Sequence, residues 1–273
     1  MYKLIGLDMD GTLLNKEKKV TKANYEAIQQ AKKQGKKVVI STGRPLIGVK
    51  KFLKELDLIS DEDYVVAFNG ALVQTTKSGK IISKTTLSLD DYKELYELSK
   101  ELGVNIHALT ESSVITPNNN KYTDLEGSMN GIDVYELPVE SVDKDETIVK
   151  VMMIDEPELI DEIIPKIPQN IKDKYTIVKS APFFLEFLHK SVNKGVGINA
   201  VANELGINSD KVICVGDAEN DLAMIEYAGL GVAMENGFDE VKEIADYITL
   251  SNEEDGVAHV INKFMVEKVE AVE

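Results

Sequence analysis

An apolar run near the N-terminus leads directly into two aspartates that are separated by a single residue. The run Lys3–Leu7 has the length and composition of a short buried strand. Side chains two apart on a strand point to the same side, so Asp8 and Asp10 should leave the sheet as a pair. Two carboxylates this close repel each other unless a cation or a proton lies between them. The alternative is a plain turn whose aspartates cap the next element, but such a turn seldom needs Asp-x-Asp-Gly-Thr.

Strands and helices then alternate in an order that is typical of a parallel sheet. The segments expected after the first strand are a helix over 21–34, a strand over 37–41, a helix over 45–56 and a strand over 65–68. This βαβαβ order predicts an α/β fold with a doubly wound, Rossmann-like parallel sheet. Ligands bind such sheets at the carboxyl ends of the strands, where Asp8, Thr42 and Asn69 all fall.

The pattern changes near residue 85, beyond which strands outnumber helices. The segments expected there are a helix over 88–103, strands over 105–109, 114–116 and 148–154, a helix over 157–167, and strands over 175–179 and 183–188. They indicate an inserted α+β domain with an antiparallel sheet. We therefore predict a core domain formed by residues 1–84 and 190–273, interrupted by the inserted domain 85–189.

The α/β pattern returns in the last third of the chain. The segments expected there are a helix over 193–205, a strand over 212–215, a helix ending at 228, a strand over 230–233, a helix over 239–245, a strand over 247–249 and a helix over 254–264. Lys194 starts the first of these helices, and Gly216-Asp217-Ala218-Glu219-Asn220-Asp221 follows the strand. The charged tail 266–273 is expected to fray.

The composition limits the kinds of partner. A formal net charge of −16 predicts repulsion from nucleic acid and from anionic membranes, although acidity also simply keeps a protein soluble. No apolar run is long enough to span a membrane, and no signal peptide is evident. The single cysteine, Cys214, lies in an apolar run and is expected to be a buried thiol. Together these features predict a cytoplasmic protein. The sequence leaves its oligomeric state open between a monomer and a homodimer.

The set of motifs, in this order, resembles the haloacid dehalogenase superfamily. The four motifs of that family are matched in turn by Asp8–Thr12, Thr42, Lys194 and Gly216–Asp221. An insertion placed after Ser-Thr-Gly-Arg-Pro resembles the Cof-type phosphatases, which carry a large C2 cap domain. The amino-acid sequences of Lys150–Pro157 and Lys179–Pro182 are similar to those of the bacterial YidA group of sugar phosphatases.

The resemblance implies a Mg²⁺-dependent phosphatase that hydrolyses small sugar phosphates. Asp8 would be the nucleophile, and Asp10 would act as general acid and then as general base. Mg²⁺ prefers oxygen ligands, which Asp8 and Asp217 would supply together with the main-chain carbonyl of Asp10. Asp221 would orient ligands and waters around the ion.

The phosphate group needs hydrogen-bond donors and positive charge. Thr42 offers a hydroxyl, Gly43 a backbone N–H beside a helix N-terminus, and Lys194 a full positive charge. The family pattern adds the backbone N–H of Met9 and the side-chain amide of Asn220. Arg44 could contact substrate, the inserted domain or a surface acid, and Asn69 could face the substrate or form an ordinary turn. The three histidines, His107, His189 and His259, have no metal-ligand spacing.

Two other functions are compatible with these residues. A phosphosugar mutase on the same scaffold would return the phosphoryl group to a sugar instead of to water. A phosphate-binding regulatory module would have no turnover at all, but an intact Asp10 argues against it, because binding alone needs no acid or base.

Overall fold

The computed structural model describes residues 1–267, and the chain folds into two compact units. The first consists of residues 1–43, 50–83 and the described chain from 193 onward, and the second of residues 44–49 and 84–192. The sequence-based division placed the two main changes after 84 and after 189, and it assigned 44–49 to the core. The tail expected to fray over 266–273 lies mostly outside the described residues.

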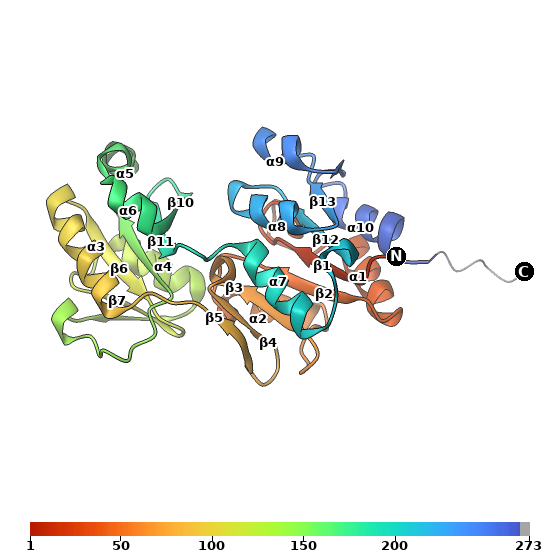
Figure 1. The fold of residues 1–273 in the computed structure, drawn as a ribbon, viewed down its shortest axis with the longest axis horizontal. Helices are drawn as coiled ribbons and strands as arrows, with labels where there is room; N and C mark the ends of the chain where they lie inside the picture. Colours follow the sequence, from red (N-terminus) through yellow and green to blue (C-terminus); the bar gives the residue numbers. More distant parts are fainter. Residues whose placement is uncertain (268–273) are drawn as a thin grey trace, which may run out of the picture. The chain divides into compact units, whose positions relative to one another are not determined.

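Eight strands of the described chain form the sheet of the first unit, in the order β14-β13-β12-β1-β2-β3-β4-β5 (Figure 1). Their bounds are β1 Leu4–Leu7, β2 Lys37–Ser41, β3 Tyr64–Ala67, β4 Leu72–Thr75, β5 Ile81–Lys84, β12 Val212–Gly216, β13 Leu230–Ala233 and β14 Tyr247–Ile248. All neighbours from β14 to β3 are parallel, and β4 runs antiparallel to β3. The α/β prediction for this unit is therefore confirmed.

Strand β1 lies inside the sheet, with another strand paired to each of its two sides. The chain passes first to β2 on one side, and β12 later pairs with the other side of β1. Every residue of β1 is buried, as the apolar run at the N-terminus predicted. The order of a doubly wound sheet reverses at such a strand, and ligands bind outside the carboxyl ends there. The residues that follow β1 and β12 are therefore the first place to look for a site.

Helices connect these strands, and their starts and ends follow from local sequence. Their bounds are α1 Lys22–Lys33, α2 Leu46–Glu55, α7 Lys194–Glu204, α8 Leu222–Tyr227, α9 Asp239–Ile244 and α10 Gly256–Val260. The Thr21 hydroxyl accepts from the Asn24 N–H and begins α1, as expected from sequence. Asn24 of α1 is buried although it is polar. Its side-chain N–H donates to the Leu13 carbonyl, and its side-chain oxygen accepts from the Ala258 N–H, so its polar atoms have partners. The last predicted helix, over 254–264, is shorter and continues as a π turn over Ile261–Met265.

The second unit has its own sheet in the described chain, in the order β10-β11-β9-β6-β7-β8. The bounds are β6 Asn105–Leu109, β7 Ser113–Thr116, β8 Asp133–Glu136, β9 Lys150–Ile154, β10 Tyr175–Ala181 and β11 Phe184–His189. The predicted antiparallel sheet is wrong at one edge, where β7 and β8 are parallel. The reason is that helix α4, Lys121–Asn130, joins those two strands, and parallel neighbours need such a crossover.

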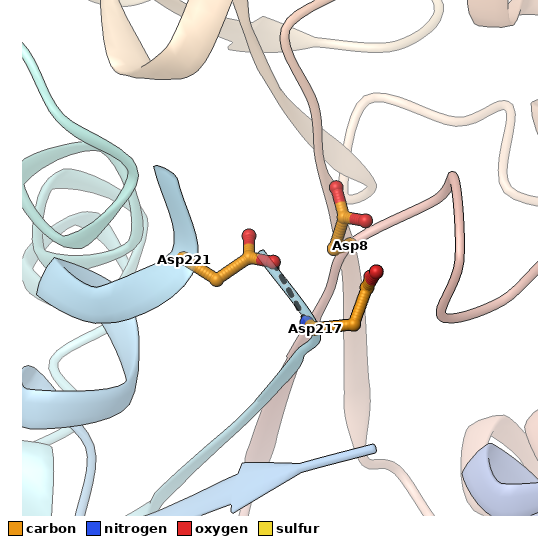
Figure 2. Close-up of side chains that lie close together, drawn as sticks. All are labelled: Asp8, Asp217 and Asp221. Atoms are coloured by element: carbon orange, nitrogen blue, oxygen red, sulfur yellow. Dashed lines mark hydrogen bonds between the residues drawn. The ribbon is translucent and has the colours of Figure 1, made fainter. Parts of the chain in front are cut away.

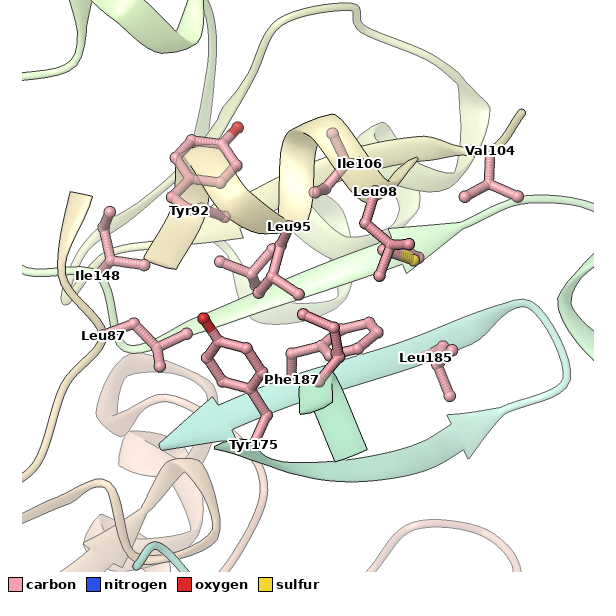
Figure 3. Packing of buried hydrophobic residues seen from close by; sticks show 14 of the residues in the cluster. Leu87, Tyr92, Leu95, Leu98, Val104, Ile106, Ile148, Tyr175, Leu185 and Phe187 are labelled. Atoms are coloured by element: carbon pink, nitrogen blue, oxygen red, sulfur yellow. The ribbon is translucent and has the colours of Figure 1, made fainter. Parts of the chain in front are cut away.

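One face of this second sheet is covered by helices and forms an apolar core (Figure 3). The helices of the unit, besides α4, are α3 Leu89–Leu102, α5 Pro157–Ile163 and α6 Gln169–Lys174. Helix α3 starts at a capping box, in which the Ser88 and Asp91 side chains accept from each other's backbone N–H. Tyr92 and Leu95 of α3 pack in the same cluster as Phe187 of β11. Full burial of each such side chain contributes about 1.5–3 kcal/mol to stability.

The sequence did not predict three elements of the second unit, α4, β8 and α6. Helix α4 follows a run of three asparagines, Asn118 to Asn120, a composition that is typical of a loop. The last of them, Asn120, is instead the N-cap, and its side chain accepts from the Tyr122 and Thr123 N–H groups. Helix α5 is also shorter than the predicted 157–167, because a 3-10 turn over Ile164–Lys166 follows it.

Charged side chains are buried beside the strands of the second unit. The Lys150 ammonium lies 2.8 Å from the Glu186 carboxylate and 3.4 Å from that of Glu126, and each of the three side chains is at most 6% exposed. His107 is also buried, with Nδ1 3.2 Å from the Thr123 hydroxyl oxygen. Burial, reinforced by the positive charge of Lys150, lowers the pKa of His107 from its ordinary 6.5 to about 3.

The neutral state of His107 makes stability depend on pH. Between about pH 6.5 and 3 the unfolded chain binds a proton at His107 and the folded chain does not, so acidification favours unfolding. From pH 7.5 to pH 5.0 the free energy of unfolding should fall by about 2 kcal/mol because of this residue. Urea unfolding at both pH values, compared between wild type and His107→Asn, measures the contribution as a difference. An equal pH dependence in the two proteins would contradict it.

Candidate active site

Asp8 and Asp217 lie side by side at the carboxyl edge of the first unit's sheet. Parallel pairing aligns Leu7 with Val215, and the Asp8 N–H donates to the Val215 carbonyl at 3.0 Å. Each aspartate therefore follows the end of a neighbouring strand. Figure 2 shows their carboxylates together with that of Asp221, which comes from the segment after β12.

Lys194 supplies a positive charge inside this group. Its Nζ lies 2.6 Å from an oxygen of Asp8 and 2.6 Å from an oxygen of Asp221, and its side chain is fully buried. The lysine is the first residue of α7, which is capped by the Asn193 side chain accepting from the Val196 N–H. The helix start thus delivers the ammonium group to two carboxylates that come from different strand ends.

Asp221 binds both Lys194 and the backbone of the Asp217 segment through its two carboxylate oxygens. One of its oxygens accepts from Lys194, and the other accepts from the N–H groups of Asp217 and Ala218 at 2.9 and 3.0 Å. The hydrogen bond from the Asp217 N–H to Asp221 is the dashed line in Figure 2. Asp221 is fully buried. It therefore orients both the lysine and the backbone that carries Asp217.

The Asp-Gly-Thr part of the first motif packs directly against Asp217. The Thr12 hydroxyl donates to Asp217 Oδ1 at 2.7 Å. Gly11 has a φ of +89°, and a Cβ atom at this position would lie 2.2 Å from Asp217 Oδ2. Both the backbone conformation and the close approach therefore require glycine. The N-terminal motif and the later Gly-Asp motif form one structure.

The electrostatics of the group are governed by burial and by an excess of carboxylates. Burial raises the pKa of Asp8 well above its ordinary range; the positive charge of Lys194 lowers that pKa, and the neighbouring Asp221 and Asp217 raise it. Burial likewise raises the pKa of Asp217 to about 6, although the Thr12 hydrogen bond opposes it. For Lys194, burial lowers the pKa, but Asp221 and Asp8 raise it by more, so the lysine is protonated. One lysine cannot balance two buried carboxylates and a half-buried third one.

This donor set fits a hard divalent cation. Asp8, Asp217 and Asp221 each offer a carboxylate oxygen, and the three oxygens lie within 4.8 Å of one another. A cation there would balance the excess negative charge that raises the pKa values. Carboxylate oxygens are the ligands that Mg²⁺ prefers. Asp221, which the sequence suggested only as an orienting residue, is part of this acidic group.

A second group of the predicted residues gathers around Asn69. The Asn69 N–H donates to the Thr42 carbonyl at 2.9 Å, and the Asn69 side chain accepts from the Asn220 amide at 3.0 Å. The Cα of Gly43 also faces the Asn69 side chain, since a Cβ there would lie 3.3 Å from its oxygen. Thr42, Gly43 and Asn220, which come from different motifs, therefore share one neighbour.

Asp10 and Met9 have different surroundings from Asp8. The Asp10 side chain is 38% exposed, and its carboxylate lies 2.7 Å from the Lys18 ammonium. Met9 is fully buried, so its side chain is part of the core. The accessible position of Asp10 suits exchange of a proton with water, whereas Asp8 is buried among charges.

The structure also places four residues to which the sequence assigned no definite role. Arg44 belongs to the second compact unit. His189 bonds Ser191, and the His259 ring stacks on Tyr247, so neither histidine takes part in the acidic group. Glu219, which lies between Asp217 and Asp221 in the sequence, is exposed.

Two residues near the site were not found from sequence. The Asn236 amide donates to the Gly11 carbonyl at 2.8 Å, and the Phe238 N–H donates to the Asp217 carbonyl at 2.9 Å. They follow β13, the fifth parallel strand of this sheet along the chain. The polar Asn236 just after the end of that strand was the signal that could have pointed to this segment.

Comparison with known proteins identifies the family. The family model for haloacid dehalogenase-like hydrolases matches residues 5–261. The chain belongs to this family. The predicted superfamily and Cof type are therefore confirmed, while membership of the YidA group stays a prediction.

The relatives of this haloacid dehalogenase-like hydrolase carry phosphatase names. A Bacillus subtilis protein named "Putative phosphatase YxeH" is 46% identical over 270 residues, covering 98% of this chain and all of that protein. The 5-amino-6-(5-phospho-D-ribitylamino)uracil phosphatase YcsE of the same organism is 33% identical over 267 residues, covering 97% and 96%. These names support a phosphatase.

Solved structures match the hydrolase over nearly its whole length. A haloacid dehalogenase-like hydrolase from Bacteroides thetaiotaomicron has a TM-score of 0.84 and 29% identity, covering 96% of this chain and 99% of that one. A sugar phosphatase of subclass IIB has a TM-score of 0.78 and 25% identity, covering 96% and 98%. Within residues 1–267, no helix combines the length and the apolar character that crossing a membrane requires.

Proposed function

We propose that this hydrolase is a Mg²⁺-dependent phosphatase of small sugar phosphates that works through a phospho-aspartate on Asp8. The observation that carries the proposal is the Lys194 ammonium, which lies 2.6 Å from both Asp8 and Asp221 beside Asp217. A plain structural ion pair would not need a third carboxylate, that of the half-buried Asp217, beside a lysine already paired with two buried ones. The likeness to a solved sugar phosphatase supports the substrate class.

In the first step an oxygen of Asp8 attacks phosphorus and the bond from phosphorus to the sugar oxygen breaks. Asp10 gives its proton to that leaving oxygen, because an alkoxide leaves poorly without one. In the second step water attacks the phosphorus, Asp10 takes a proton from the water, and the bond to Asp8 breaks. Phosphate leaves, and both aspartates return to their starting states.

Donors around the phosphate would stabilise the charge that develops on its oxygens. We assign this role to Lys194, to the Thr42 hydroxyl, to the Asn220 amide and to the backbone N–H groups of Met9 and Gly43. Asp8, Asp217 and the Asp10 carbonyl would hold Mg²⁺, with Asp221 beside them. The ion would supply positive charge that lets an anionic carboxylate approach an anionic phosphate.

Turnover should depend on a divalent cation. With p-nitrophenyl phosphate as a generic substrate, the wild-type protein should release phosphate in Mg²⁺ and lose at least about 99% of its rate in EDTA, since Asp8 would then face its substrate without a balancing charge. Colorimetric detection of phosphate measures both rates, and restoring Mg²⁺ is the control for irreversible damage. No turnover with any phosphorylated metabolite in Mg²⁺ would end the proposal.

Product analysis separates hydrolysis from the alternatives. A screen of phosphorylated sugars should yield free phosphate, whereas a mutase would yield an isomerised sugar phosphate and a binding module neither. None of the comparisons favours a mutase or a binding module. The selection of the sugar by residues 85–189, cytoplasmic localisation, and a monomeric or homodimeric state stay predictions.

A further inference from the structure

The segment that follows β3 has an unusual backbone. The three consecutive residues Phe68, Asn69 and Gly70 have φ values of +50°, +56° and +100°. Phe68 and Asn69 are not glycines, and both are buried. Left-handed conformations cost free energy for residues with a Cβ atom, so they persist where the surroundings hold them, and they gather at functional sites.

Asn69 has contacts that an ordinary Asn-Gly turn does not need. Its N–H donates to the Thr42 carbonyl at 2.9 Å, and its side-chain oxygen accepts from the Asn220 amide at 3.0 Å. The same oxygen would lie 3.3 Å from a Cβ placed on Gly43. One buried side chain thus spans two stretches to which we assign phosphate donors.

The next residue ties the segment to a third stretch. A Cβ on Gly70 would lie 2.2 Å from the Asn193 carbonyl oxygen, so the backbone passes directly against the start of α7. Asn193 caps this helix, and Lys194 is its first residue. The residues 68–70 therefore touch the backbone that presents the buried ammonium group.

We propose that Asn69 is a positioning residue for phosphate, and that it acts by orienting the side-chain amide of Asn220. An amide nitrogen has two N–H groups, so the bond to Asn69 leaves Asn220 a second donor for a phosphate oxygen. Because the hydrogen bond to Asn69 fixes the orientation of the Asn220 amide, it also fixes the direction of the second N–H. This inference rests on the proposed function, because it assumes that the site binds a phosphate group.

The test compares inorganic phosphate binding, in Mg²⁺, by wild type, Asn69→Gly, Asn220→Ala and the double variant. Glycine tolerates the left-handed backbone, so the first variant removes only the side chain. Calorimetry should show phosphate binding weakened about tenfold by each single change and still about tenfold, not a hundredfold, by both together. Such non-additivity is expected only if Asn69 acts through Asn220, and a merely structural role would not produce it.

Turnover gives a second readout. Because small misplacements of reacting groups are costly, kcat/KM for p-nitrophenyl phosphate should fall about a hundredfold in Asn69→Gly. Asp57→Gly is the matched control, since Asp57 also has a positive φ of 53° but is exposed and lies outside the site. Its phosphate binding and turnover should equal those of wild type.

The outcomes separate this inference from the proposed function. Wild-type phosphate affinity in Asn69→Gly, or effects that multiply in the double variant, would overturn the positioning role alone. Phosphate binding without turnover in wild type would overturn the phosphatase proposal and leave the positioning role standing. A wild-type protein that binds no phosphate would overturn both.

A variant that does not fold would not decide the question, so melting temperatures are measured first. If Asn69→Gly is unfolded, Asn69→Leu replaces it, because leucine fills similar space but cannot accept from Asn220. Phosphate binding should again weaken about tenfold. Unchanged binding in that variant would overturn the inference.

Discussion

Replacing Asp8 with asparagine is expected to reduce phosphate release by at least about 10⁴-fold. The amide has nearly the same shape as the carboxylate, and its oxygen can still accept from Lys194. It cannot attack phosphorus, so no phospho-enzyme forms. Initial rates with p-nitrophenyl phosphate in Mg²⁺ measure the loss, and Asp57→Asn at an exposed position is the control. Full activity in Asp8→Asn would exclude the proposed mechanism.

The same variant should remain folded, and this distinguishes a chemical role from a structural one. Burial raises the pKa of Asp8 in the folded state, so its ionised form at pH 7 opposes folding rather than supporting it. Asparagine removes that charge. In EDTA, urea unfolding should therefore show a free energy of unfolding no lower than that of wild type. A large destabilisation would mean that the ionised Asp8 mainly holds the fold together.

Replacing Lys194 with methionine is expected to have the opposite effect on stability. Methionine fills similar space but leaves Asp8 and Asp221 buried without their cation, and breaking a buried ion pair in this way costs about 3–5 kcal/mol. Phosphate release should also be lost. Urea unfolding in EDTA measures the first effect, and the phosphate assay measures the second.

The control for Lys194→Met is a lysine whose ion pair is exposed. Lys166 pairs with Glu162 one helical turn away, and both side chains are more than half exposed. Lys166→Met should change the free energy of unfolding by less than about 1 kcal/mol. Adding Asp8→Asn to Lys194→Met should restore part of the lost stability, because one uncompensated charge is removed. If Lys194→Met is as stable as wild type, the buried cluster is not organised as we describe it.

Much of the first unit could be predicted because its signals are local. The strands β2 and β13 and the start of α1 follow from apolar runs and a capping threonine, and the structure has them at the expected residues. Helix α4 could not be found in the same way, since it is mostly polar and its N-cap stands at the end of an asparagine run. The parallel pairing of β7 with β8 depends on that helix, so it was missed as well.

The candidate site shows the same division. The Asp-x-Asp-Gly-Thr and Gly-Asp-x-x-x-Asp motifs, together with Lys194, indicated which residues to examine. Their spacing did not indicate that Asp221 would divide its two oxygens between Lys194 and the Asp217 backbone. Nor did it show that Asn69, which could have been an ordinary turn, connects Thr42 to Asn220.

The sequence by itself determined the α/β class, the family and the identity of the acidic residues, because apolar periodicity and short motifs are properties of neighbouring positions. Only the tertiary structure decided which of those residues lie close enough to interact electrostatically. Parallel pairing of β1 with β12 brings Asp8 beside Asp217, and the start of α7 brings Lys194 between Asp8 and Asp221. Burial then makes their interactions strong, since water no longer screens them. That burial arises only when distant parts of the chain pack together.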